Sequence, residues 1–322
     1  MLRRSVGGNR SHGRQVEAVT LRVRLTLVAV LVTLGPGLLR AQEAGPGGSG
    51  WLFPDVSYFR AVLADPHDPR LSIGLIRTNL FGSRGPERPA YVRSPGDGAE
   101  IQAAAAIGAT FPVFHVSRSA DGGLTIGAQA GVFARFRIEH PSRDDLGQDW
   151  FIGMPIDAAW GESSLRFRLI HHSSHLGDEF IESTGGRRVE VGGEAFDLLL
   201  ARQLGAIRVY GGGGWVFHSN TATTEILREL GRSDRLTLHA GLDGEWKPFA
   251  EQRLSVRAGA DWQSAQRTGW RSMWALAGGL RADVGHGSTT LLIRYTGGQS
   301  ALGQFFLTGE EVWTLEVGLS PG

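Results

Sequence analysis

The sequence predicts an all-β fold, an antiparallel transmembrane β-barrel of twelve strands, and two observations carry that prediction. The first is the strict alternation of apolar and polar residues within short segments. In residues 235–246, for example, Leu236, Leu238 and Leu242 share one face, while charged and polar residues share the other. Period two is typical of a strand whose two faces meet different surroundings, and charge-rich polar faces fit a barrel with lipid outside and a polar lumen inside.

The second observation is the rhythm of the connections between these segments, which alternate long and short along the chain. Single-chain outer-membrane barrels have an even number of strands, short turns at the periplasmic end and longer loops outside the cell. The strands are expected in order near residues 71–80, 99–114, 123–138, 149–160, 163–174, 187–204, 206–218, 235–247, 252–263, 271–284, 288–296 and 311–319.

The chain begins with a pattern that predicts an export signal over residues 1–41. Arginines precede an apolar run at 25–39, and the small residue Ala41 follows as a cleavage position. The apolar run is too short for a membrane-spanning helix, and no second run follows, which argues against an inner-membrane protein. Residues 42–70 are predicted to be a periplasmic or plug segment, and residues 71–322 the outer-membrane barrel.

The overall composition indicates which partners to expect. The 322 residues include 33 basic and 32 acidic ones, a balance that gives no indication of a nucleic-acid partner. There is no cysteine, so the sheet itself must provide the stability that disulfides give many exported proteins. The expected partners are outer-membrane lipid and, during insertion, the barrel-assembly machinery. We expect no cofactor and no metal, and the sequence predicts no particular oligomeric state.

The fourth predicted strand has the length and pattern of a membrane span. Trp150 and Trp160 share its outward face with the apolar residues Ile152, Met154 and Ile156 between them. Ten tilted strand residues cover roughly 25 Å, the height of the apolar band between the aromatic girdles of such barrels. Trp246, Trp262 and Trp313 also fall on outward positions.

The inward positions carry nearly equal numbers of basic and acidic side chains. This balance predicts an ion-paired lumen that is narrow or plugged, with a narrow small-solute channel left as one alternative function. The residues assigned to the lumen are Arg135, Arg137, Arg166, Arg168, Arg208, Arg235, Arg253, Arg257, Arg281, Arg294, Glu100, Asp157, Glu190, Glu194, Asp243, Glu245, Asp261, Asp283 and Glu316.

One cluster, the His-His-Ser-Ser-His run at 171–175, could carry chemistry, and a reactive group could form on either face of its strand. On the outward face, His171 would be a base and Ser173 a nucleophile. On the inward face, a hairpin symmetric about residue 181 would place His172 and Ser174 with Glu190, and Arg168 opposite Glu194. A structural ladder of cross-strand pairs is the simpler interpretation, and ligand or metal binding is a third.

These residues also resemble known families. The run Ser-Ser-His-Leu-Gly-Asp-Glu-Phe at 173–180, together with 53–55, 64–70 and Gly-Gln-Phe-Phe at 303–306, resembles the bacterial family called domain of unknown function 1207. This resemblance covers essentially the whole mature chain and implies a bacterial envelope protein without an assigned activity.

A local resemblance concerns the enzyme hypothesis. The pair His171-x-Ser173 resembles outer membrane phospholipase A and lipid A deacylase. The resemblance implies a lipid-facing serine whose histidine is oriented by a third polar residue. In the phase assigned to the sixth strand, the outward residues are Val189, Val191, Gly193 and Ala195. None of them has a polar side chain, so this strand is not expected to supply the residue that orients the histidine.

The sequence therefore predicts an outer-membrane protein of a Gram-negative bacterium with a structural or lipid-facing role of unassigned activity. Its enzyme alternative is a serine-type acyl-ester hydrolase acting on outer-membrane lipid.

Overall fold

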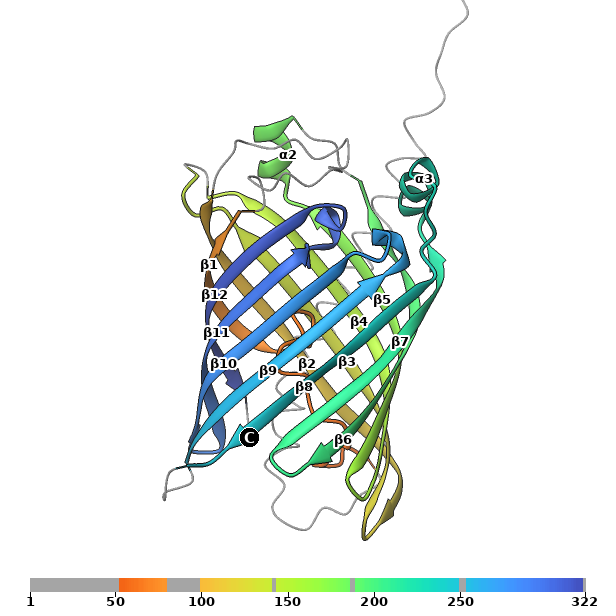
Figure 1. Ribbon diagram of the computed structural model, residues 1–322, viewed down its shortest axis with the longest axis vertical. Coiled ribbons are helices and arrows are strands. Elements are labelled where there is room, and N and C mark those ends of the chain that lie inside the picture. Colours follow the sequence, from red (N-terminus) through yellow and green to blue (C-terminus); the bar gives the residue numbers. More distant parts are fainter. Residues whose placement is uncertain (1–51, 80–98, 141–142, 186–188, 249–252, 321–322) are drawn as a thin grey trace, which may run out of the picture. The chain divides into compact units, whose positions relative to one another are not determined.

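The computed structural model describes residues 52–79, 99–140, 143–185, 189–248 and 253–320. Within these residues, twelve antiparallel strands close into a barrel in which each strand pairs with its neighbours in sequence and the first pairs with the last (Figure 1). The predicted all-β fold and strand number are confirmed. The expected signal peptide, residues 1–41, lies outside the described residues.

The observed strands lie within a few residues of the predicted ranges. They are β1 (Leu71–Thr78), β2 (Glu100–Ser119), β3 (Gly122–Phe136), β4 (Asp145–Trp160), β5 (Ser163–Leu176), β6 (Val191–Leu204), β7 (Ile207–Ser219), β8 (Leu236–Trp246), β9 (Leu254–Ala265), β10 (Ser272–Val284), β11 (Gly287–Gln299) and β12 (Gly309–Ser320).

Short helical elements interrupt the connections at one end of the barrel. They are α2 (Asp178–Thr184), α3 (Thr221–Glu229), and the 3-10 turns η1 (Gln266–Thr268) and η2 (Gly303–Phe305). In the described part of the chain, no helix is both long enough and apolar enough to cross a membrane.

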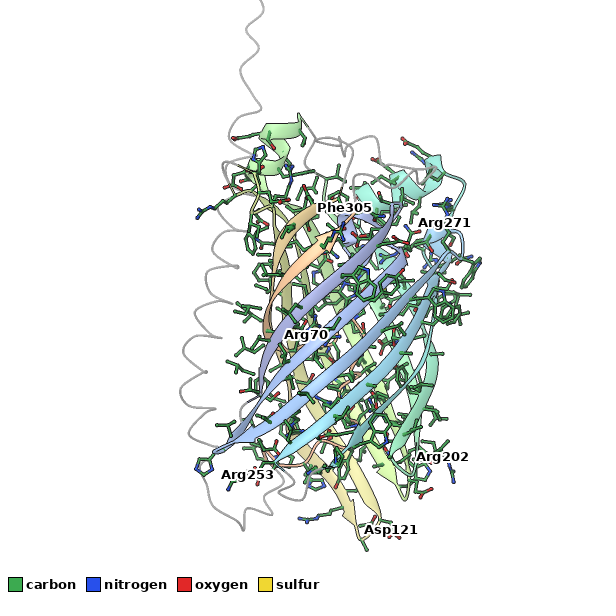
Figure 2. The ribbon with its side chains drawn as sticks, turned by 60° about the vertical axis from the view of Figure 1, so that its left-hand side comes forward. Arg70, Asp121, Arg202, Arg253, Arg271 and Phe305 are labelled. Atoms are coloured by element: carbon green, nitrogen blue, oxygen red, sulfur yellow. The ribbon has the colours of Figure 1, made fainter. Side chains whose placement is uncertain are left out.

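The two ends of the barrel differ. At the short-turn end, Gly161, Gly205 and Gly285 have φ of 56°, 61° and 60°, a left-handed conformation that glycine adopts without steric cost. At the long-loop end lie the helices and 3-10 turns. Figure 2 shows Asp121 and Arg202 at the short-turn end and Arg271 and Phe305 at the opposite one.

The outer wall of the barrel is apolar along its strands. Large side chains such as Ile73, Ile107 and Ile293 are more than half exposed although they lie in the middle of regular strands. Trp160 and Trp246 end their strands at the short-turn end. Such a surface is stable against lipid rather than water, as in transmembrane barrels.

The lumen is occupied by residues 58–70, which run through it before β1 begins (Figure 1). Phe59 is 1% exposed, and its ring lies 4.8 Å from the Arg166 guanidinium and 5.4 Å from that of Arg208. This segment has no regular secondary structure, so its buried carbonyls need donors from elsewhere. Arg166 donates to the carbonyl of Phe59, Arg208 to those of Arg60 and Ala61, and Arg294 to that of Leu63.

Ion pairs line the lumen, in keeping with the expected balance of charge. Arg166 pairs with Asp157 at 2.7 Å, and Arg208 pairs with Asp243 at 2.5 Å. Further lumenal pairs are Arg135–Glu310, Arg168–Asp197, Arg257–Glu245 and Arg294–Glu316.

The long-loop end is closed by an apolar cluster. Phe305 and Phe306 from the η2 loop pack with Phe180 of α2 and Leu227 of α3, all of them buried. The amide of Gln304 donates to the carbonyls of Ser174 and Val189 at 2.5 and 2.8 Å, which holds this loop against β5 and the start of β6.

The pairing of β5 with β6 differs from the expected hairpin. His172 lies opposite Gly193 rather than Glu190, and Arg168 lies opposite Asp197 rather than Glu194, a shift of three residues. The connection holds α2 instead of a symmetric turn, so the register is fixed by burial and by the Arg168–Asp197 ion pair. Because an odd shift turns a strand over, every β6 side chain lies on the face opposite to the predicted one.

This shift corrects two residues that were assigned to the lumen. Glu194 lies on the outer face, in phase with the exposed Phe196 and Leu198. Glu190 precedes β6 and is exposed. The lumenal acid of β6 is Asp197 instead.

Candidate functional site

The outward half of the histidine–serine run lies on the apolar wall near the long-loop end. The His171 side chain is 51% exposed and lies opposite Ile152 of β4. Ser173 follows two residues later and lies opposite Trp150. Because side chains alternate along a strand, the exposed Leu169 and His171 and the buried Ser174 place Ser173 on the outer face.

The carboxylate that sequence analysis did not find on this face is Glu194. Its Oε1 lies 2.8 Å from the Nδ1 of His171, directly across the β5–β6 pair. With Nδ1 held, the Nε2 nitrogen of His171 is left for a second partner. One sequence signal could have located Glu194. Phe196, Leu198 and Leu200 are apolar residues at every second position, which marks the outward face of β6, and Glu194 continues the same series.

A second histidine, His218 of β7, contacts the other oxygen of the same carboxylate, Nδ1 to Oε2. It reaches the outer face through a β-bulge: Ala195 pairs with Val216 and Glu194 with His218, which leaves Phe217 as an extra residue. Val216 is buried, whereas Phe217 and His218 are both exposed. Bulges of this kind re-aim side chains and are frequent beside active sites.

Apolar side chains surround the polar group. Phe217 and Phe196 lie 4.7 Å apart between ring centroids, and Phe196 in turn lies 5.6 Å from Phe167. Beside the serine, Gly192 allows the two strands to approach closely, because a Cβ there would lie 2.6 Å from the carbonyl oxygen of His172 and 3.3 Å from the Cβ of Ser173. The site thus combines a polar centre with a surface suited to acyl chains.

The inward residues are placed differently. The His172 ring stacks on Phe151 at 6.1 Å, and its Nε2 lies 3.5 Å from a guanidinium nitrogen of Arg267. Ser174 donates a hydrogen bond to Asp149, which also accepts from the backbone of Gly303.

The structure does not assemble His172, Ser174 and Glu190 into one group, because β6 pairs three residues away from the expected register. The metal interpretation also finds no support. Within the described ranges, no three histidine, aspartate or glutamate side chains are grouped as metal ligands.

The outer group consists of residue types that serine hydrolases use. A serine is a weak nucleophile unless a base accepts its proton, and the base works best when a third group fixes its orientation and stabilises its charged form. Ser173, His171 and Glu194 are the residue types that this unit requires, on the same face of neighbouring strands.

A closed antiparallel barrel with an apolar outer wall defines the chain as having the fold of outer-membrane β-barrel proteins. The chain belongs to the family described as protein of unknown function (DUF1207), whose model matches residues 50–319. The family resemblance predicted from the sequence is thereby confirmed. No curated protein sequence matches the chain.

Solved structures with a similar fold include outer membrane phospholipase from Salmonella typhi, a dimer with bound calcium. It is 11% identical, covers 80% of this chain and 94% of its own, and has a TM-score of 0.51. Outer membrane phospholipase A from Escherichia coli is 10% identical, with coverages of 80% and 93% and a TM-score of 0.47. The transport unit of the Escherichia coli autotransporter AIDA-I is 11% identical, with coverages of 80% and 92% and a TM-score of 0.42. These likenesses concern the fold.

Proposed function

We propose that the protein is a serine-type acyl-ester hydrolase that acts on lipid of the outer membrane in a Gram-negative bacterium. The observation that carries this proposal is the contact between His171 and Glu194, 2.8 Å long, on the lipid-facing side of Ser173. Glu194 supplies the orienting group without which the histidine–serine pair would be incomplete.

The location of the site supports a lipid substrate. Ser173 lies three residues from the end of β5 at the long-loop end. If the long loops face the outside of the cell, as is usual for such barrels, this depth corresponds to the outer leaflet, close to where acyl chains are esterified. The aromatic and aliphatic side chains around the site would contact those chains.

Each residue has a defined role in the proposed reaction. The Ser173 hydroxyl attacks the ester carbonyl, and the Nε2 of His171 takes the hydroxyl proton and delivers it to the leaving alcohol. Water then releases the fatty acid from Ser173 by the same route. Glu194 holds the His171 ring through Nδ1 and stabilises its positive charge while the proton resides there. His218 keeps the carboxylate of Glu194 in place from the other side.

The test is release of fatty acid from phospholipid and from lipopolysaccharide by the purified full chain in detergent. Ser173→Ala and His171→Ala should each abolish release, since members of a nucleophile–base unit act together. Glu194→Gln should lower kcat by roughly 10²–10⁴, because the amide cannot stabilise the imidazolium.

Two control variants change the same residue types on the opposite face of the same strand. Ser174→Ala and His172→Ala should leave hydrolysis intact, and heat-modifiable migration on gels should show that every variant is folded. Loss of hydrolysis in the control pair instead would assign the reaction to the lumen. Absence of release by the parent chain on both lipids would contradict the proposal and leave the outer group as a structural ladder.

A further inference from the structure

A cavity of about 230 Å³ lies inside the barrel at its long-loop end, between the plug segment and the η2 loop. Its lining includes Gln129, Phe151, His172, Arg267 and Phe306. One water molecule occupies about 30 Å³ of liquid, so this space accommodates an organic molecule of several heavy atoms. Ser173 and Phe196 border it as well, but His171 and Glu194 do not line it.

Arg267 differs from the arginines that line the rest of the lumen and plug. Ten of those are within 4 Å of a carboxylate, namely Arg60, Arg70, Arg135, Arg137, Arg166, Arg168, Arg208, Arg257, Arg281 and Arg294. In the part of the chain that the structure describes, the Arg267 guanidinium has no such partner. Its contacts are the Phe306 ring at 5.4 Å and the Nε2 of His172 at 3.5 Å, and its Nε is buried without an acceptor.

Among the described residues, none of the four acidic side chains that line the cavity forms an ion pair with Arg267, and each accepts hydrogen bonds from other groups. Asp234 accepts from Ser219. Asp149 accepts from Ser174 and Gly303, Asp197 from Arg168, and Asp65 from Gln263 and the backbone of His67. A partly buried cation without a counter-charge is costly, so an anion entering the cavity would be bound at Arg267.

A second polar group in the cavity also lacks a partner. Gln129 is 5% exposed, and its Oε1 is buried without a hydrogen bond among the described residues. Buried amides in native proteins are nearly always hydrogen-bonded, and an exception beside a cavity indicates a ligand group or water there. The lining also includes three aromatic rings, those of Phe151, His172 and Phe306.

From this arrangement we infer that the cavity is a binding site for a small organic anion with a flat apolar body. The anionic group is bound by Arg267, with His172 beside it, the body lies against the aromatic rings, and a polar substituent reaches the Gln129 amide. Arg267 and Gln129 take no part in the proposed hydrolysis, so this inference does not depend on the proposed hydrolase activity.

Benzoate is a suitable probe, since it combines one carboxylate with a flat ring, and benzyl alcohol is its uncharged counterpart. Binding is measured by isothermal titration calorimetry on the full chain in detergent. Benzoate should bind to the parent chain, and benzyl alcohol should bind more weakly. Arg267→Gln should weaken benzoate binding by roughly 10- to 150-fold, the loss expected for a hydrogen bond to a charged group.

Two further variants separate charge from folding. Arg267→Lys keeps the charge and should retain most of the affinity. Arg202→Gln removes an exposed arginine at the short-turn end and should change nothing. Heat-modifiable migration checks that each variant forms the barrel. The inference is wrong if the parent chain does not bind benzoate at millimolar concentration, if benzyl alcohol binds equally well, or if Arg267→Gln binds benzoate like the parent.

Discussion

The ion pair between Arg208 and Asp243 should be a major source of the stability of the plugged barrel, and Asp243→Asn tests it. The two side chains are 4% and 5% exposed, and the guanidinium donates to both carboxylate oxygens, at 3.1 and 2.5 Å. Asparagine keeps the shape of the side chain and removes its charge. Arg208 would then be a buried cation without a counter-charge.

The expected loss of stability can be worked from these contacts. Removing one partner of a buried pair costs about 3–5 kcal/mol. Arg208 keeps hydrogen bonds to the carbonyls of Arg60 and Ala61, so we expect the lower end of that range, about 3 kcal/mol. Arg60 also contacts Asp243, but its side chain is 43% exposed, so solvent screens its contribution to about 0.3 kcal/mol.

The assay is urea-induced unfolding of the barrel in lipid vesicles, followed by the fluorescence of its tryptophans. The matched control is Glu162→Gln, which breaks the pair with Arg202, where both side chains are more than half exposed. That variant should lie within about 0.5 kcal/mol of the parent. Equal stability of the Asp243→Asn and Glu162→Gln variants would refute the conclusion that the lumenal pair is buried and stabilising.

Two further outcomes are expected. Gly212→Ala should prevent formation of the heat-modifiable barrel, because a Cβ there would lie 1.8 Å from the carbonyl oxygen of Leu198. The control Gly278→Ala should fold, since the nearest atom to its Cβ would be 3.9 Å away. A folded Gly212→Ala variant would contradict the register of β6 and β7. In intact cells, cysteine at Glu229 in α3 should react with a membrane-impermeant reagent and cysteine at His286 in a short turn should not, and equal labelling would contradict the orientation with long loops outside.

Much of the fold could be predicted from the sequence because a barrel strand carries its own signal. Alternation over ten or more residues fixes which residues form a strand and how its faces differ, as in Leu236–Trp246. The short turns are equally local, since glycines such as Gly161 and Gly285 mark them. Closure then follows, because each strand pairs with its neighbour in the chain.

The candidate site could be predicted only in part. His171 and Ser173 continue the phase of Leu165, Phe167 and Leu169, so their outward direction follows from β5 alone. Glu194 belongs to another strand, and assigning it to the same face requires the register between the two. The seven residues of α2 lie in the intervening connection, and nothing local indicates how they displace the start of β6.

The sequence by itself therefore determined the barrel, its strands and the histidine–serine pair, because all of these depend on periodicity within one segment. Tertiary structure alone decided three further features: the β5–β6 register that brings Glu194 to His171, the bulge that turns His218 outward, and the cavity that contains Arg267. Each of them depends on contacts between segments distant in the chain. A register is selected by which side chains can be paired in the lumen or placed against lipid, and a shift by one or three residues exchanges the two faces.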